Sequence, residues 1–148
     1  MWCRIFCLKE TAPEPNALAD GLRKLGYAVE EVKTDADELG WFHLELTTSA
    51  GAFILDRYLA DEGIRGDLNS WAAWLEEHAG VHAGWLMQHM IGTRQLITLR
   101  RDDRGDDEVA RSLSHQLAIG LAAETGVYQI DGEGFFDQFG TRLVSEEP

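Results

Sequence analysis

The sequence predicts an α+β fold: a mostly antiparallel sheet of about eight strands in hairpins, with three helices packed mainly on one face. Short segments in which apolar and polar residues alternate are typical of strands that bury one side of a sheet. Several of these segments follow one another across short turns, as the strands of hairpins do. Three longer segments carry apolar residues at helical spacing. The 148 residues fit one domain, spanning residues 1–148.

The first half of the chain contains four expected strands and one expected helix. The strands are residues 2–8, 27–33, 41–48 and 52–59. The helix lies within residues 11–26, where prolines stand near its start and Gly26 at its end. Ser49-Ala50-Gly51 separates the last two strands, which predicts a hairpin between them.

The second half is expected to begin with a helix that Asp67 or Asn69 caps and that runs to about Glu77. Gly92-Thr93 suits a two-residue hairpin turn between two strands. Acidic residues open a third helix over residues 106–124, where negative charge favours the helix dipole. The remaining expected strands are residues 84–91, 94–100, 127–130 and 135–144.

The amino-terminal segment points to a reducing compartment. Cys3 and Cys7 would stand about 13 Å apart along one strand, too far for a disulfide, so we expect two buried free thiols. The segment lacks the basic and apolar regions of a signal peptide, and no stretch is apolar enough to span a bilayer. We therefore expect a cytoplasmic protein with no membrane contact.

The charge of the chain disfavours nucleic acid and favours basic partners. The formal net charge is −13, and residues 30–77 carry twelve acidic and three basic groups, a net of −9. Nucleic acid usually requires a clustered positive surface, whereas a negative one attracts a basic protein. The alternative is that the charge serves only solubility.

The preferred interpretation is a non-enzymatic cytoplasmic interaction protein that binds a basic protein partner, in an immunity-like or adaptor-like role. Immunity-type inhibitors of toxins use such charge complementarity, an analogy of charge and size alone. The candidate contact residues combine acidic side chains with aromatic side chains expected at the surface. They are Trp2, Asp35, Asp37, Glu38 and Trp41.

The alternative interpretation is a small enzyme or small-ligand binder. If residues 41–48 pair with 52–59 around Ala50-Gly51, His43 lies opposite Tyr58 and Glu45 opposite Asp56. These four side chains would share the polar face of the sheet, with Trp41 beside them and Phe42 on the apolar face. A histidine beside a carboxylate can transfer protons, and a tyrosine can donate one. An ordinary solvent-facing sheet would look the same in the sequence.

Other candidate motifs predict no bound group. His78, His82 and His89 have metal-ligand spacing, but Gly80 and Gly84 interrupt the helix that such a site needs, so no metal is expected. His115 falls opposite the apolar stripe of its helix and is expected to be exposed. Sequence motifs for phosphate, dinucleotide or metal-dependent chemistry are lacking, so no cofactor is expected.

The segment Asp131-Gly132-Glu133-Gly134 combines carboxylates with glycines. Asp-Gly between two strand-like segments predicts a hairpin turn. A calcium loop of the EF-hand kind would need ligands where Phe135 and Phe136 stand. Asp137 could still approach Asp131 across the turn, which leaves a weak cation site as the alternative.

Overall fold

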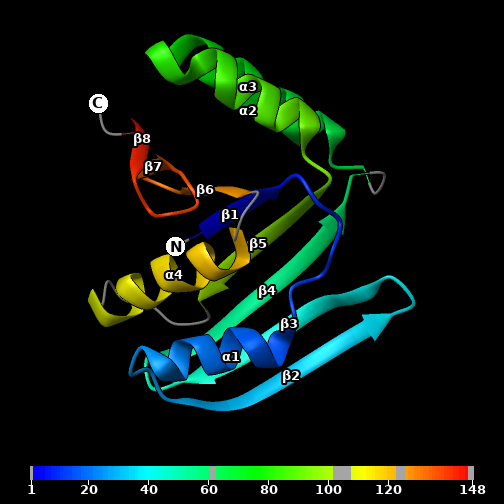
Figure 1. The fold of residues 1–148 in the computed structure, drawn as a ribbon, viewed down its shortest axis with the longest axis vertical. Coiled ribbons are helices and arrows are strands. Elements are labelled where there is room, and N and C mark those ends of the chain that lie inside the picture. Colours follow the sequence, from blue (N-terminus) through cyan, green and yellow to red (C-terminus); the bar gives the residue numbers. More distant parts are fainter. Residues whose placement is uncertain (1, 61–62, 102–107, 123–125, 147–148) are drawn as a thin grey trace.

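The computed structural model describes residues 2–60, 63–101, 108–122 and 126–146 (Figure 1). Its strands are β1 (Trp2–Cys7), β2 (Val29–Asp37), β3 (Gly40–Thr48), β4 (Gly51–Leu59), β5 (Gln95–Arg101), β6 (Gly126–Ile130), β7 (Gly134–Phe136) and β8 (Arg142–Ser145). Its helices are α1 (Pro15–Lys24), α2 (Arg65–His78), α3 (Ala83–Gly92) and α4 (Glu108–Ala122), with a 3₁₀ turn, η1 (Gly80–His82), between α2 and α3.

The eight strands form one sheet in the order β2-β3-β4-β5-β1-β6-β7-β8. Every neighbouring pair is antiparallel. The predicted α+β class and antiparallel sheet are therefore confirmed. β1 lies inside the sheet between β5 and β6, whereas β2 and β8 are its edges.

Helices cover both faces of the sheet, and the prediction of three helices mainly on one face is wrong. Ile5 and Phe6 are neighbours on β1, so their side chains point to opposite faces, and both are fully buried. Ile5 belongs to the core formed with α1 and α4, and Phe6 to the core formed with α2 and α3. In Figure 1 the α2–α3 pair lies at the top, and α1 and α4 lie lower, along the sheet.

The additional helix is α3, which occupies the segment predicted as strand 84–91. Leu86, His89 and Met90 are its buried residues, at the spacing of one helical face. Thr93 ends the helix instead of turning a hairpin. The count of eight strands survives because the segment predicted as one strand over 135–144 forms two, β7 and β8.

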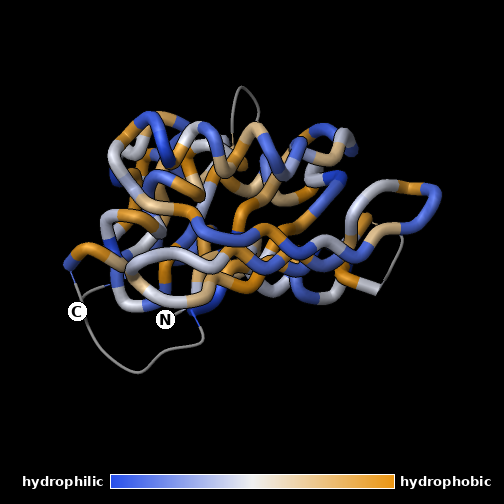
Figure 2. Tube along the Cα trace, turned by 90° about the horizontal axis from the view of Figure 1, so that it is seen from below, coloured by the Kyte–Doolittle hydropathy of each residue, from blue (hydrophilic) through white to orange (hydrophobic). Residues whose placement is uncertain are grey.

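The β2–β3 hairpin extends beyond the helices. Its turn projects at the right of Figures 1 and 2, and in Figure 2 a hydrophilic stretch at the tip adjoins a hydrophobic one. α1 covers the inner part of this hairpin on one face, where Leu44, Leu46 and Val29 are buried. Most side chains in the remainder of the hairpin are exposed to solvent.

Candidate functional site

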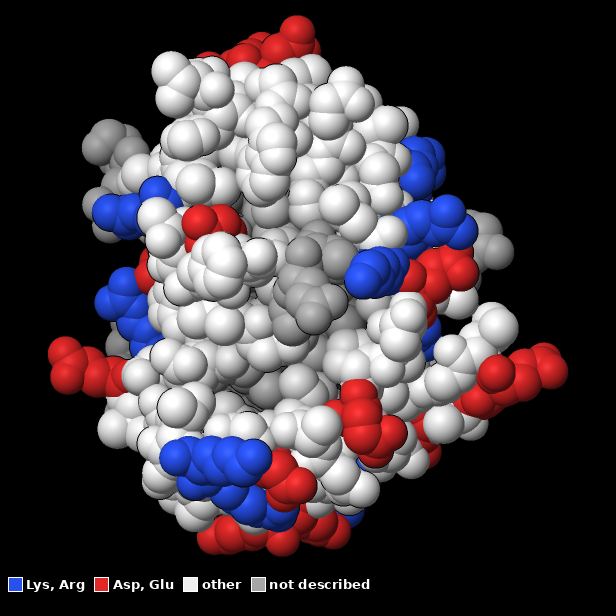
Figure 3. Space-filling view, in the orientation of Figure 1, with Lys and Arg blue, Asp and Glu red and all other residues white. Residues whose placement is uncertain are grey.

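The β2–β3 hairpin presents a group of exposed acidic side chains. We call residues 30–42 the acidic hairpin. Its acidic residues, all exposed, are Glu30, Glu31, Asp35, Asp37 and Glu38. Lys33 is its one basic residue, so the formal charge of the segment is −5 + 1 = −4. In Figure 3 acidic side chains gather along the lower margin and lower right of the molecule, over β2 and the turn that follows it.

Local interactions fix the turn of the acidic hairpin. Asp37 Oδ1 accepts a hydrogen bond of 2.8 Å from the backbone N–H of Leu39. Gly40 has a φ of +107°, a conformation that residues with a side chain rarely adopt. The turn leaves the side chain of Leu39 59% exposed. An apolar side chain therefore stands at the tip among carboxylates.

A β-bulge next to the turn reverses the predicted orientation of two aromatic residues. Asp35 pairs with His43 and Ala36 with Trp41, so Phe42 is the extra residue of β3. Phe42 is 46% exposed, whereas Trp41 is buried. Trp41 donates from Nε1 to the backbone carbonyl of Pro13 at 2.6 Å. The prediction of a surface Trp41 is wrong, and Phe42 occupies the exposed position instead.

Trp2 is exposed, as predicted, but it lies away from the acidic hairpin. Its side chain is 43% exposed, and the guanidinium of Arg100 lies 6.0 Å from its ring centre. β1 stands four strand positions from β2, or about 19 Å at the usual strand spacing. Of the five predicted contact residues, Asp35, Asp37 and Glu38 lie together in the acidic hairpin.

The second candidate site is a His43–Asp56 pair on the open face of the sheet. His43 Nδ1 lies 2.6 Å from Asp56 Oδ1, and His43 Nε2 lies 3.5 Å from Glu45 Oε1. The structure thus brings these three predicted residues together. The hydrogen bond that His43 donates to the Asp56 carboxylate is the largest cause of the raised pKa of His43; burial opposes this shift, and Glu45 adds to it.

The predicted register of this hairpin is wrong by two residues. His43 pairs with Asp56, and Glu45 with Ile54. The turn centres on Ser49-Ala50 because Thr48 Oγ1 accepts from the N–H of Ala50 at 3.1 Å. A shift of two residues keeps every side chain on its face, so the polar set survives the error.

A pocket of about 450 Å³ lies beside this pair. Asp56 pairs across the sheet with Thr98, and Thr98 lines the pocket. Tyr58 lines it as well. The other lining residues are Leu96, also on β5, Trp2 and Arg4 on β1, Asp67 and Trp71 on α2, and Ile64 just before α2. Tyr58 therefore belongs to the pocket, next to the His43–Asp56–Glu45 group. Sequence reasoning could not find the pocket because α2 forms one wall.

The carboxylates of the Asp131–Glu133 turn are held by arginines. The turn joins β6 to β7, as predicted, and the N–H of Glu133 donates to the carbonyl of Ile130 at 3.0 Å. Asp131 Oδ1 accepts from Arg4 Nη1 at 2.7 Å. Glu133 forms a two-point contact with Arg111, including Nε to Oε2 at 3.0 Å. Among described residues, no group of three or more metal-ligating side chains is found.

His115 belongs to the same network, which the sequence analysis missed. The prediction that it is exposed is wrong: its Nδ1 lies 2.9 Å from Tyr128 Oη, and its Nε2 lies 3.3 Å from Glu133 Oε1. Burial would raise the pKa of Glu133, but the hydrogen bonds of Arg111 and His115 outweigh it, so this pKa is lowered. Arg111 and His115 stand four residues apart on α4, so they lie on one face of the helix, and both contact Glu133.

Two further histidines, His78 and His89, have structural contacts. His78 Nδ1 lies 2.8 Å from the carbonyl of Trp74, and its ring stacks on that indole. His89 is buried, and its Nε2 donates to the carbonyl of Phe6 at 2.8 Å. Cys3 and Cys7 are buried free thiols, as predicted.

Comparisons with known proteins leave the site to be interpreted from its own geometry. No protein-family model matches the chain, and neither a curated protein nor a solved structure matches it. None of the helices in the described segments has the length and apolar character needed to cross a membrane.

Proposed function

We propose that the protein is a non-enzymatic interaction protein that binds a basic segment of another protein through the acidic hairpin. The observation that carries this proposal is the edge strand β2, which bears exposed acidic side chains and leads into a turn with exposed Leu39 and Phe42. An edge strand can accept a further strand through its backbone N–H and C=O groups. An immunity-like or adaptor-like role in the cytoplasm would use such a surface, and the buried free thiols fit that compartment.

The face beside β2 would select the side chains of the partner. Glu31, Lys33 and Asp35 pair across the strands with Thr47, Glu45 and His43, so they lie on the same face as those residues. Lysine or arginine at alternate positions of an added strand would meet Glu31, Asp35 and Glu45. A second copy of β2 would instead oppose like charges, which disfavours self-pairing.

The net charge supports the same partner at long range. At −13, the protein attracts a basic chain and accelerates its encounter, an effect that salt screens. Leu39 and Phe42 at the turn would then bury apolar area against the partner, and salt does not weaken this contribution to the affinity. We expect the association rate to fall steeply with ionic strength.

The test uses a nine-residue peptide of alternating lysine and threonine, with an alternating glutamate and threonine peptide as the probe of opposite charge. Titration calorimetry and backbone NMR should show binding of the lysine peptide, with amide shifts concentrated in residues 30–42. Asp35→Lys/Glu38→Lys should weaken binding at least tenfold. The matched control Glu76→Lys/Glu77→Lys makes the same change of charge at exposed sites on α2 and should change binding less than threefold.

Equal losses in the two variants would show that net charge alone attracts the peptide, and the proposal would fail. Shifts centred on another element would place the binding surface elsewhere. Submicromolar binding of generic DNA at physiological salt would contradict the choice of a protein partner.

A second candidate function is the binding or conversion of a small molecule at the His43–Asp56 pair. The observation that favours it is the 450 Å³ pocket beside the pair, with Tyr58 and Arg4 among its walls. Histidine and carboxylate would move a proton, and Tyr58 would orient or protonate a bound group.

This candidate is tested by ligand-observed NMR with amino acids, nucleosides and small carboxylates. Binding that His43→Gln and Tyr58→Phe abolish, without a change in melting temperature, would support it. His78→Gln, at an exposed position on α2, is the control and should leave binding unchanged. A sharp fall in melting temperature in His43→Gln would assign His43 a structural role instead.

A further inference from the structure

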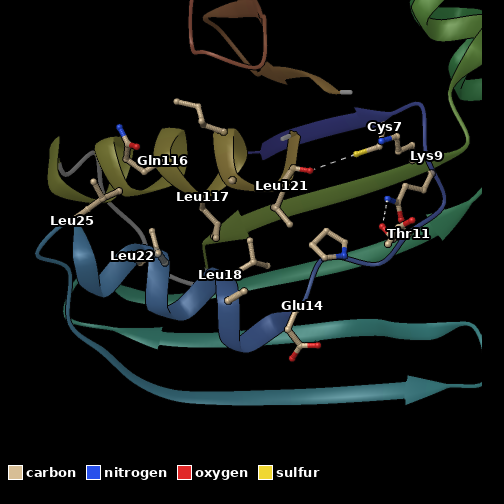
Figure 4. A pocket seen from close by; sticks show the side chains of 16 residues that line it. Cys7, Lys9, Thr11, Glu14, Leu18, Leu22, Leu25, Gln116, Leu117 and Leu121 are labelled. Atoms are coloured by element: carbon tan, nitrogen blue, oxygen red, sulfur yellow. Dashed lines mark hydrogen bonds between the residues drawn. The ribbon is translucent and has the colours of Figure 1, made fainter. Parts of the chain in front are cut away.

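A groove of about 600 Å³ runs between α1 and α4, on the face of the sheet opposite the His43–Asp56 pair (Figure 4). Its volume falls within the range of small-molecule sites, about 300–1,000 Å³. It shares no lining residue with the pocket near Tyr58. The groove is therefore a separate place to bind a ligand.

The walls of the groove are leucine-rich. α1 contributes Leu18 and Leu22 and the following Leu25, and α4 contributes Leu117 and Leu121. Leu22, Leu117 and Leu121 are buried at its base, whereas Leu25 is 58% exposed. In Figure 4 Leu25 lies at the left end of the groove, and the other leucines follow along its length. The groove offers an elongated apolar surface.

Two glycines inside the helices keep the groove open. Gly21 lies within α1 and Gly120 within α4, where glycine costs about 1 kcal/mol relative to alanine. A Cβ at Gly21 would meet no atom within 4 Å, and one at Gly120 would touch only Leu18 Cδ2, at 3.6 Å. Larger residues at these positions would extend into the space between the helices.

The right end of the groove in Figure 4 is polar. Lys9, Thr11 and Gln95 line it together with Cys7. Gln95 is fixed there, because its Nε2 donates to the carbonyl of Thr11 at 2.9 Å and its Oε1 accepts from Arg57 at 2.6 Å. Burial raises the pKa of the Cys7 thiol to about 12, so it is a neutral lining group and no nucleophile.

We propose that this groove binds an elongated amphiphile, with an alkyl chain between α1 and α4 and an anionic head group at the Lys9 end. Gln116 borders the groove near Leu25, but in Figure 4 its side chain points away from α1. The apolar length and the one end that carries a basic side chain define a ligand with one chain and one head. The ammonium of Lys9 favours a carboxylate over a cation there. Glu14 also borders the groove, but its side chain points away from α4 in Figure 4.

The test compares decanoate with decyltrimethylammonium, both as monomers, by titration calorimetry on the full chain. Decanoate should bind at least tenfold more tightly. General electrostatic attraction to a protein of charge −13 would give the reverse preference, so the order of affinities is diagnostic. Backbone NMR should place the shifts induced by decanoate at Gly21 and Gly120.

Three variants complete the experiment. Gly21→Leu should fill the groove and reduce decanoate affinity at least tenfold, while Gly66→Leu, at an exposed position on α2 where an added Cβ also meets no atom within 4 Å, should leave it unchanged. Lys9→Gln should reduce decanoate affinity and leave the affinity for decyltrimethylammonium unchanged. Unaltered decanoate binding in Gly21→Leu, a preference for the cation, or the absence of binding would each overturn the proposal.

Discussion

Arg57 donates from Nη1 to the backbone carbonyl of Leu39 at 3.1 Å and thereby ties the turn of the acidic hairpin to the neighbouring strand β4. The same nitrogen donates to the carbonyl of Trp41 at 3.1 Å. Nη2 donates to the carbonyl of Glu10 at 2.7 Å, and Nε to the side chain of Gln95. One buried guanidinium therefore holds the turn of the hairpin against the segment that follows β1.

Replacing Arg57 with methionine should destabilise the protein by about 3 kcal/mol or more, because three backbone carbonyls and the side chain of Gln95 would lose a charged donor. The melting temperature should fall, and amide exchange should accelerate first in residues 37–41. Arg94→Met is the control, since the side chain of Arg94 forms an exposed ion pair with Glu10 whose loss should leave the melting temperature almost unchanged. Equal effects of the two substitutions would refute this role for Arg57.

The sequence predicted the sheet well because alternation is a local signal. Leu44, Leu46, Phe53 and Leu55 share one core, as their spacing indicated. The polar set of His43, Glu45 and Asp56 followed from the same alternation and survived the register error. Local spacing thus identified three members of the second site without any knowledge of the fold.

Features that depend on packing between distant segments were missed. The bulge at Phe42 buries Trp41, which reaches the carbonyl of Pro13, and only the assembled fold brings that acceptor near. α3 was predicted as a strand because a short apolar segment fits both structures until its packing partners are known. The pocket at Tyr58 depends on α2, which lies on one face of the sheet, and the groove depends on α1 and α4, which lie on the other face.

The His43–Asp56 pair should make stability depend on pH. The folded-state pKa of His43 is raised above its ordinary value of 6.5. Its contribution is therefore fully present below pH 6.5 and is lost as the pH rises through the folded-state value. The side chains are partly exposed, so the contribution should stay below about 1 kcal/mol. Urea unfolding between pH 5.5 and 9 measures it.

His43→Gln should remove this part of the pH dependence, and Asp56→Asn should reduce it similarly. Burial lowers the pKa of His89, so His89 makes stability depend on pH in the opposite direction. Because His89 is unchanged in both variants, its contribution cancels when each variant is compared with the wild type. NMR titration of the His43 ring provides a direct check. A pKa of 6.5 or lower in the folded protein would contradict the prediction.

Both thiols should resist alkylation in the folded protein. Burial raises the pKa of Cys3 as well as that of Cys7, and the thiolate is the reactive form. Iodoacetamide at pH 8 should modify neither residue within a time that fully modifies the urea-unfolded chain, as read by intact mass spectrometry. Rapid modification of Cys7 alone would instead show that the groove between α1 and α4 admits the reagent to its polar end.

Gly134 should tolerate no side chain. Its φ is +128°, and an added Cβ would lie 1.8 Å from the backbone oxygen of Val144 in the neighbouring strand. Gly134→Ala must separate β7 from β8, and we expect a loss of at least about 3 kcal/mol in the free energy of unfolding. Gly132 in the preceding turn is the matched control: its φ is +81°, but a Cβ there meets no atom within 4 Å. Gly132→Ala should therefore cost only the backbone strain, about 1–2 kcal/mol. Chemical denaturation of the two variants measures the difference, and equal losses would show that strain alone, without the clash against Val144, governs both positions.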